Sequence, residues 1–298
     1  MKLKQLVIIS GKGGTGKTIL SASFAHLAEN KIMVDCDVDA ANLHVLLHPI
    51  IKERYPFSGG KKARLIPEDC IDCGECLDAC RFDAIHENDD GSILIDPLSC
   101  EGCAVCSHIC PTQAIAMDPA DSGEWYVSET KYGPFIHGQL GPGEEASGKL
   151  ITEIRNKSQE IAKKYNLNLI IIDGPPGIGC PVISSLSGVD LALVVTEPTQ
   201  SGIHDMKRVI ETAHHFNIDV ACIINKYDLN NKKTLELENW CRKNSISFLG
   251  KIPFDLNVLD SMVKGIPLTE YDSSPASAKI KQIWQSVQTR LKQEGENE

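Results

Sequence analysis

Uninterrupted runs of apolar residues alternate with helix-like stretches along most of the chain. Strands that are buried on both faces have this continuous character, because helices cover both faces of a parallel sheet. The helix-like stretches span residues 18–30, 150–165, 203–216 and 276–293, and the apolar runs span residues 5–9, 32–35, 169–173, 191–195 and 220–224. The pattern predicts an α/β fold in which helices cover both faces of a mostly parallel sheet.

The alternation stops between about residue 55 and residue 148, where Pro, Gly and Asp become more frequent. Within this interruption lies an internal repeat. The segments CIDCGECLDAC (70–80) and CEGCAVCSHIC (100–110) place four cysteines at one spacing, offset by 30 residues. The α/β pattern flanks the repeat on both sides, which indicates an insertion. We therefore predict a discontinuous host domain of residues 1–60 and 120–298 and an inserted domain of residues 61–119.

Negative charge is concentrated in the same segment. Residues 65–119 hold 12 acidic side chains and one basic side chain, Arg81, so this segment carries −11 in a chain whose net charge is −10. Nucleic-acid binding depends on clustered Lys and Arg, and we expect no nucleic-acid partner. An acidic surface instead favours a protein partner with a basic docking face.

The sequence shows no pattern of secretion or membrane insertion. No apolar run approaches the length that spans a bilayer, and the first residues lack the apolar stretch and cleavage site of a signal peptide. The amphipathic helix predicted at 276–293 is expected to pack on its own sheet. We expect a cytoplasmic protein without membrane contact, in which the 12 cysteines serve metal binding or catalysis rather than disulfides.

The segment GKGGTGKT, residues 11–18, matches the phosphate-loop pattern G-x-x-x-x-G-K-[ST]. It follows a predicted strand and opens a predicted helix, which is the context that this motif requires. Lys17 is expected to reach the β- and γ-phosphates, and the Thr18 hydroxyl is expected to ligate Mg²⁺. The residues of the loop that we expect to bind the nucleotide are Gly11, Gly13, Gly14, Thr15, Gly16, Lys17 and Thr18.

The same loop holds a second lysine, Lys12, and so reads K-G-G-x-G-K-T. It resembles the deviant Walker A motif of the MinD/ParA family, which also contains Mrp-type iron–sulfur carriers and the nitrogenase iron protein. In that family the first lysine reaches across a dimer to the phosphates of the partner subunit. The resemblance implies a slow, Mg²⁺-dependent ATPase that binds ATP and ADP, forms a homodimer with ATP, and uses Lys12 and Lys17 in catalysis.

Two further segments resemble the family's switches. VDCDVDAANL (34–43) supplies Asp37, which by resemblance orients the attacking water or assists Mg²⁺. IIDGPPGIG (171–179) supplies Asp173, which the resemblance places near Mg²⁺ through water, and Gly177, which permits close approach to the γ-phosphate. We therefore expect both segments to respond to the nucleotide.

The adenine-contacting positions of the family are matched by Asn225, Pro253 and Asp255. Ordinary turn chemistry is the alternative explanation for these three residues. The resemblance covers about residues 1–58 and 134–290, which leaves the cysteine-rich segment outside it.

Each cysteine unit follows C-x2-C-x2-C-x3-C and resembles bacterial two-cluster ferredoxins over about residues 65–117. In such proteins three close cysteines hold one [4Fe-4S] cluster and the fourth ligates the other cluster. Zinc is the alternative, although zinc sites made only of cysteine normally use paired C-x2-C knuckles. The predicted ligands are Cys70, Cys73, Cys76 and Cys110 for cluster 1, and Cys100, Cys103, Cys106 and Cys80 for cluster 2.

Together these patterns favour a dimeric ATPase coupled to electron transfer through two [4Fe-4S] clusters. The expected partner is a redox protein, or a small protein that binds a metal cofactor, with a basic docking face. One alternative is an iron–sulfur or metal-cofactor carrier or assembly ATPase. A second alternative is a positioning ATPase whose clusters are sensory.

Overall fold

The computed structural model describes nearly the whole chain, and its contacts divide it into two units. Unit 1 comprises Met1–Tyr55, Trp125–Gln139 and Ser147–Glu298, and unit 2 comprises Pro56–Glu124 and Leu140–Ala146. Within the described residues, no helix has the length and apolar character needed to cross a bilayer. The described residues are 2–142, 144, 147–271 and 273–293.

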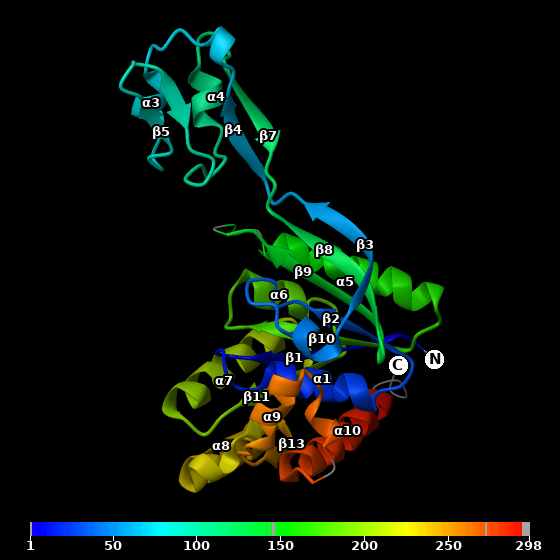
Figure 1. The fold of residues 1–298 in the computed structure, drawn as a ribbon. Coiled ribbons are helices and arrows are strands. Elements are labelled where there is room, and N and C mark those ends of the chain that lie inside the picture. Colours follow the sequence, from blue (N-terminus) through cyan, green and yellow to red (C-terminus); the bar gives the residue numbers. More distant parts are fainter. Residues whose placement is uncertain (1, 143, 145–146, 272, 294–298) are drawn as a thin grey trace. The chain divides into compact units, whose positions relative to one another are not determined.

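A nine-stranded sheet carries the fold (Figure 1). Every neighbouring pair from β13 to β9 is parallel, which confirms the parallel sheet that the sequence predicted. In sheet order the strands are β13 (Ser247–Ile252), β12 (Asp219–Asn225), β11 (Leu191–Thr196), β1 (Lys4–Ser10), β10 (Leu169–Pro176), β2 (Lys31–Asp35), β9 (Gly133–Leu140), β8 (Gly123–Thr130) and β3 (Ile50–Phe57).

One face of the sheet forms a large apolar core with three helices. Leu6 and Ile8 point to this face from β1 and belong to the same buried cluster as Phe24 and Trp284. The rings of Phe24 and Trp284 lie 4.7 Å apart. The covering helices are α1 (Lys17–Leu27), α2 (Leu43–Leu47) and α10 (Pro275–Gln293).

The opposite face is covered by other helices. Ala221 and Ile223 of β12 point into the first core, so Cys222 between them must point the other way. The Cys222 thiol indeed contacts the Met206 sulfur of α7 at 3.5 Å. Helices α5 (Ser147–Lys164), α6 (Cys180–Leu186) and α7 (Gln200–His215) pack on the sheet, and α8 (Asn231–Lys243) packs on β13. The chain therefore has a layered α/β fold with helices on both faces of the sheet.

Two strands of the sheet lie where the sequence predicted an interruption. Strand β8 contains Glu, Ser and Thr and is buried at only two positions, and strand β9 interrupts its apolar residues with Gly, His and Gln, so both lack the continuous apolar runs of the central strands. A two-residue connection, residues 131–132, joins them. The pattern failed here because an outer hairpin need not be buried along its whole length.

Unit 2 contains two copies of one small motif. The helices α3 (Glu75–Ala79) and α4 (Val105–Ile109) are offset by 30 residues, like the cysteines. Two antiparallel pairs complete the unit: β4 (Lys61–Leu65) with β7 (Ile115–Pro119), and β5 (Ile85–Glu87) with β6 (Ile93–Ile95). Left-handed backbone conformations recur at matched positions of the copies, at Asp72 and Gly102, Gly74 and Ala104, and Asp83 and Gln113.

Candidate functional site

The loop between β1 and α1 bends sharply before the helix begins at Lys17. Gly14 and Gly16 have φ values of +76° and +95°, which side chains other than glycine rarely adopt. A Cβ atom on Gly16 would lie 2.3 Å from Nδ2 of Asn225. Glycine is therefore required at Gly16 by both backbone conformation and space.

This loop fits a phosphate group. A Cβ atom on Gly13 or Gly14 would meet no atom within 4 Å, so the inner side of the loop is open. The Lys17 side chain is only 5% exposed, and Thr15 Oγ1 is buried without a hydrogen-bond partner among the described residues. The N-terminus of α1 adds backbone N–H groups and a positive dipole end. The loop thus presents buried donors and positive charge to an anion.

Two buried carboxylates lie beside the loop. Asp35 of β2 and Asp173 of β10 are register neighbours and almost fully buried. Burial raises the pKa of both groups, and the charge of Asp173 raises the pKa of Asp35 further. Ser21 Oγ donates a hydrogen bond of 2.8 Å to Asp173. A divalent cation near this pair would offset the repulsion between the two carboxylates.

Asp35 has a positioning role that sequence reasoning missed. Its carboxylate accepts hydrogen bonds from the backbone N–H groups of Asp37, at 3.0 Å, and Leu43, at 3.2 Å. It therefore fixes the segment that carries Asp37. The available signal was its place as the first acidic residue after the apolar run 32–34.

Asp37 is expected to impose a pH dependence on ATP hydrolysis. Burial raises the pKa of Asp37 to about 6, while Lys17 lowers it and Asp173 raises it. If the ionised form orients the attacking water, kcat/KM of the free protein falls as the pH drops through about 6. A phosphate-release assay between pH 5 and 8 measures this profile. Asp37→Asn should be slower and flat over the same range, and an unchanged inflection in that variant would contradict the assignment.

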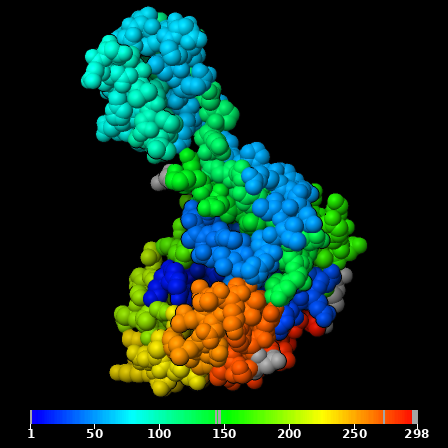
Figure 2. Space-filling view, viewed as in Figure 1, coloured from blue at the N-terminus to red at the C-terminus, as the bar shows by residue number. Residues whose placement is uncertain are grey.

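A cavity of about 640 Å³ opens at the loop, a size typical of small-molecule sites. In Figure 2 the orange surface of α9 (Asn257–Lys264) lies beside the blue surface of the N-terminal segments, and both border this cavity. Its apolar wall includes Val45, Leu259 and Met262. The residues predicted from sequence that line the cavity are Gly13, Gly14, Gly16, Lys17, Thr18, Asp37, Asn225, Pro253 and Asp255.

Two of the residues predicted to contact adenine also form hydrogen bonds that fix the segments around the cavity. Asn225 Nδ2 donates to the carbonyl oxygen of Thr15 at 2.8 Å and so braces the loop. The Asp255 carboxylate accepts from Asn257 N at 2.9 Å and Ser274 Oγ at 2.6 Å. It therefore links the start of α9 to the segment before α10. Direct contact of Asn225, Pro253 and Asp255 with a base stays a prediction.

The second switch-like segment crosses the end of β1. The backbone N–H of Gly177 donates to the carbonyl oxygen of Ser10 at 2.9 Å. Gly177 has a φ of +96°, a left-handed conformation that favours glycine. Gly174 lies so close to β1 that a Cβ atom would approach Ile9 Cγ2 to 2.5 Å. The segment is thus held against the strand that leads into the phosphate loop.

The first lysine of the loop is bound within its own chain. Lys12 Nζ lies 2.6 Å from Glu197 Oε1 and also donates to Thr199 Oγ1 and Ser201 Oγ. Glu197 also accepts from Lys226, whose Nζ donates to the carbonyl oxygen of Gly14 at 3.1 Å. The sequence singled out neither Glu197 nor Lys226. The only signal was an acidic residue directly after the buried strand β11.

Releasing Lys12 should strengthen dimer formation with ATP. Glu197→Gln removes the charge opposite Lys12, so the lysine becomes available to phosphates on a second subunit. We expect the ATP-dependent dimer to tighten about two- to fivefold, in keeping with partly exposed ion pairs of up to about 1 kcal/mol. Analytical ultracentrifugation with ATP and with ADP measures this. Glu238→Gln, which breaks the separate ion pair to Lys251, is the control; a weaker dimer in the Glu197 variant would refute the idea.

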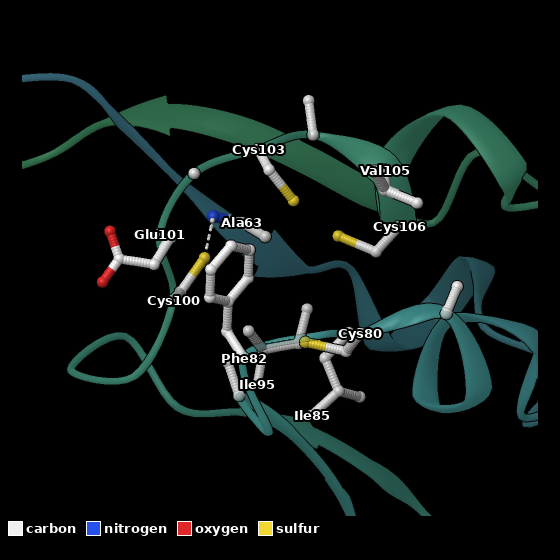
Figure 3. A pocket seen from close by; sticks show the side chains of 14 residues that line it. Ala63, Cys80, Phe82, Ile85, Ile95, Cys100, Glu101, Cys103, Val105 and Cys106 are labelled. Carbon is white, nitrogen blue, oxygen red and sulfur yellow. Dashed lines mark hydrogen bonds between the residues drawn. The ribbon is translucent and has the colours of Figure 1, made fainter.

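The eight repeated cysteines divide into two sets of four around two cavities. Cys70, Cys73, Cys76 and Cys110 line one cavity. Cys80, Cys100, Cys103 and Cys106 line the other, and Figure 3 shows their sulfur atoms directed into the space between them. In each cavity the fourth cysteine comes from the other repeat. The sequence predicts the same two sets of four, and the binding of iron–sulfur clusters by these cysteines stays a prediction.

The surroundings of the thiols suit anionic sulfur ligands. Backbone N–H groups of Ala63, Asp72 and Ala114 donate to the sulfur atoms of Cys100, Cys70 and Cys110 at 3.3–3.4 Å. Such hydrogen bonds stabilise cluster thiolates and tune their potential. Among the described residues, no three His, Cys, Asp or Glu side chains form a group that could hold a metal ion. The thiols instead enclose two spaces, and this arrangement fits a polynuclear cluster in each.

Comparison with known proteins identifies the family. Residues 6–268 match the model of the CobQ/CobB/MinD/ParA nucleotide-binding domain, so the chain belongs to this family of MinD/ParA-type ATPases. An uncharacterized protein of Methanocaldococcus jannaschii is 39% identical over 297 residues, covering 96% of both chains. An iron–sulfur cluster carrier protein of Pyrococcus horikoshii is 22% identical and covers 97% of this chain and 87% of its own length.

Solved structures support the fold. The MinC:MinD cell division complex of Aquifex aeolicus matches with a TM-score of 0.59 and 20% identity, covering 96% of each chain. The septum site-determining protein MinD of Pyrococcus horikoshii, solved with Mg-ADP, matches with a TM-score of 0.55 and 17% identity, again covering 96% of each chain. At these identities the likeness establishes the P-loop α/β fold alone.

Proposed function

We propose that this chain is an ATP-hydrolysing dimeric switch that couples nucleotide occupancy to electron transfer through two [4Fe-4S] clusters. The observation that carries the proposal is the division of eight thiols into two four-thiol cavities, with the fourth ligand exchanged between repeats. These cavities belong to the same chain as a MinD/ParA-type phosphate loop. A redox unit inserted into a nucleotide switch gives each the means to influence the other.

ATP hydrolysis uses residues of unit 1. Lys17 and the backbone N–H groups of the loop hold the β- and γ-phosphates, and Asp37 orients the attacking water. Thr18 and Asp173 would hold Mg²⁺, which neutralises phosphate charge. Lys12 leaves Glu197 and supplies a further positive charge to the partner subunit's nucleotide, so closure of the dimer and stabilisation of the transition state occur together.

Unit 2 supplies eight cysteine ligands and an acidic surface. When bound, [4Fe-4S] clusters pass single electrons from an external one-electron donor to an external acceptor. Four thiolates around each cluster leave no open coordination site, which favours electron transfer over catalysis on iron. The magnesium site therefore lies in unit 1, and both iron–sulfur sites lie in unit 2.

The partner is expected to present a basic face with an apolar centre. Cys73 and Cys103 are the exposed ligands of their two cavities. Exposed apolar side chains line both cavities, with Ile71 at 63% exposure beside one and Phe82 at 44% beside the other. The segment 65–119, which contains these positions, holds 12 acidic side chains and one basic side chain. A redox protein of opposite charge would be attracted to this surface and oriented on it.

A cluster carrier is the second candidate function. Relatives from Pyrococcus horikoshii and Pyrococcus abyssi that align with most of this chain are described as iron–sulfur cluster carrier proteins. A carrier must release its cluster, whereas four thiolates from two interlocked repeats favour retention. Transfer of iron and sulfide to an apo-ferredoxin, with loss from this chain, would favour the carrier.

A rate comparison tests the proposed coupling. Anaerobic, dithionite-reduced protein, freed of excess dithionite, is mixed with a basic one-electron acceptor such as cytochrome c. Reduction of the acceptor is followed with Mg-ATP, with Mg-ADP and with neither. We expect the nucleotide to change the rate in the natural chain and to have no effect in Lys17→Ala. Equal rates in all samples of the natural chain would refute the coupling.

A further inference from the structure

Helix α5 occupies a particular place in the chain. It begins at Ser147, directly after the short segment Leu140–Ala146 of unit 2, so at α5 the chain enters unit 1 for the last time, having first returned at Trp125. Helix α6 begins at Cys180, directly after the switch-like segment that contains Asp173 and Gly177. Helices α5 and α6 pack against each other within unit 1 (Figure 1). One helix thus follows the nucleotide switch, and the other follows the last segment that belongs to unit 2.

A buried arginine joins these two helices to the strand before the phosphate loop. Arg155 of α5 is 5% exposed. Its Nη1 donates to the carbonyl oxygens of Ser184 and Ser187, at 2.8 and 2.6 Å, where α6 ends. Its Nη2 donates to Oε1 of Gln5 on β1 at 2.9 Å. The planar guanidinium therefore fixes α5, α6 and β1 at one point, and a cation at the end of α6 is also favoured by the helix dipole.

The first turn of α5 fits closely against α6. A Cβ atom on Gly148 would lie 3.1 Å from Ser184 Oγ and 3.7 Å from Cys180 Cβ. The backbone of α5 at Gly148 therefore lies directly against the Ser184 and Cys180 side chains of α6. The hydrogen bonds of Arg155 lie two turns further along α5. Together with the contact at Gly148, they oppose sliding of α5 along α6.

Burial of this arginine is costly. Its three hydrogen bonds reach neutral oxygens, and its Nε has no partner among the described residues. A buried charge that lacks a carboxylate loses hydration without full compensation, and an apolar side chain often stabilises such a position as well or better. Stability alone thus gives a weak reason for an arginine here, whereas a fixed geometry between three elements gives a direct one.

We propose that Arg155 is a positioning residue that locks α6 to α5, so that a displacement of the segment 173–179 at the nucleotide site moves α5 and the chain segment that joins it to unit 2. This inference rests on the nucleotide switch of the proposed function and adds the route by which that switch reaches the insertion. Gly148 supports the same lock through its close contact with α6.

Hydrogen–deuterium exchange of the full chain, read by mass spectrometry, tests this route. Samples contain Mg-ATP, Mg-ADP or no nucleotide. In the natural chain we expect Mg-ATP to change exchange about fivefold or more in peptides of α6 and of α5, because both share one cooperative unit. Arg155→Lys keeps the positive charge but removes the planar guanidinium, whose nitrogens donate to Ser184, Ser187 and Gln5. It should retain nucleotide affinity and the response of α6, with the response of α5 reduced below about twofold.

Two further variants complete the test. Gly148→Ala places a methyl group against Ser184 and should weaken the α5 response in a chain that keeps Arg155, which covers the case in which Arg155→Lys fails to fold. Asn156→Ala, on the exposed side of α5, should respond like the natural chain. An α5 response that persists in both Arg155→Lys and Gly148→Ala would overturn the proposal. So would a natural chain that responds at the phosphate loop and α6 but not at α5.

Failure of the proposed function would look different. Clusters that are absent, or electron transfer that ignores nucleotide, would remove the redox role while the α5 response and its loss in Arg155→Lys still supported the lock. Conversely, nucleotide-dependent electron transfer and an α5 response that both persisted undiminished in Arg155→Lys and in Gly148→Ala would leave the redox role intact and remove the lock.

Discussion

Anaerobically purified protein with the double change Cys76→Ala and Cys110→Ala is expected to retain about four of about eight iron atoms per chain. Both cysteines line the same cavity although they belong to different repeats. Removing them together therefore destroys one cluster site and leaves the other four thiols intact. The iron that remains should have the spectrum of a single [4Fe-4S] cluster.

The matched variant pairs cysteines from one repeat. Cys76→Ala with Cys80→Ala removes one ligand from each cavity, because Cys80 lines the cavity of the second repeat. We expect this protein to lose most of its iron. If each repeat instead held its own cluster, the two double variants would exchange results. Iron and acid-labile sulfide assays on the same preparations distinguish the two arrangements, and circular dichroism of unit 1 helices controls for global unfolding.

Substitutions of the two lysines of the phosphate loop are expected to affect nucleotide binding and hydrolysis differently. Lys17 is buried at the loop and lines the cavity, so Lys17→Ala should abolish measurable nucleotide binding and reduce hydrolysis by at least about 100-fold. Lys12 is bound to Glu197 in the isolated chain. Lys12→Ala should therefore keep nucleotide affinity within about threefold while losing about 100-fold or more in hydrolysis, as expected when a charge supplied in trans is removed.

Calorimetric binding of ATP and a phosphate-release assay separate these outcomes. The oligomeric state with ATP gives a third measurement, since Lys12→Ala should remain monomeric at concentrations where the natural chain pairs. Loss of nucleotide binding in Lys12→Ala would contradict a role for this lysine at the partner's nucleotide. Normal hydrolysis in that variant would contradict it as well.

The central fold followed from sequence because its strands are buried on both faces. The runs at 5–9, 169–173 and 191–195 are continuous and apolar, and they form adjacent parallel strands in the structure. The outer hairpin of β8 and β9 was missed, because half-buried strands with Gly, Ser and Glu carry a weak local signal. Whether these segments form strands depends on their pairing with strands that are distant in the sequence, and a local pattern of residues does not contain that information.

In the candidate site, too, features set by a local motif could be predicted from the sequence, whereas contacts between residues distant in the sequence could not. Glycines at positions 14 and 16 could be predicted because a phosphate loop requires their backbone conformation. The ion pair between Lys12 and Glu197 joins residues that are 185 positions apart in the sequence. It forms because β1 and β11 are neighbouring strands of the sheet. The bonds of Arg155 to α6 likewise depend on helix packing. Such partners become visible only when the chain is folded.

Coupling between the nucleotide site and the cysteine cavities is tested most directly by EPR spectroscopy of anaerobic, reduced protein, with metal counted on the same sample. Spectra are recorded without nucleotide, with Mg-ATP and with Mg-ADP, and with Lys17→Ala as the control that cannot bind nucleotide. We predict about eight irons per chain and a cluster signal that Mg-ATP changes in the natural chain but not in Lys17→Ala. Zinc or no metal at the eight cysteines, or spectra that are identical in all three nucleotide states, would contradict the account.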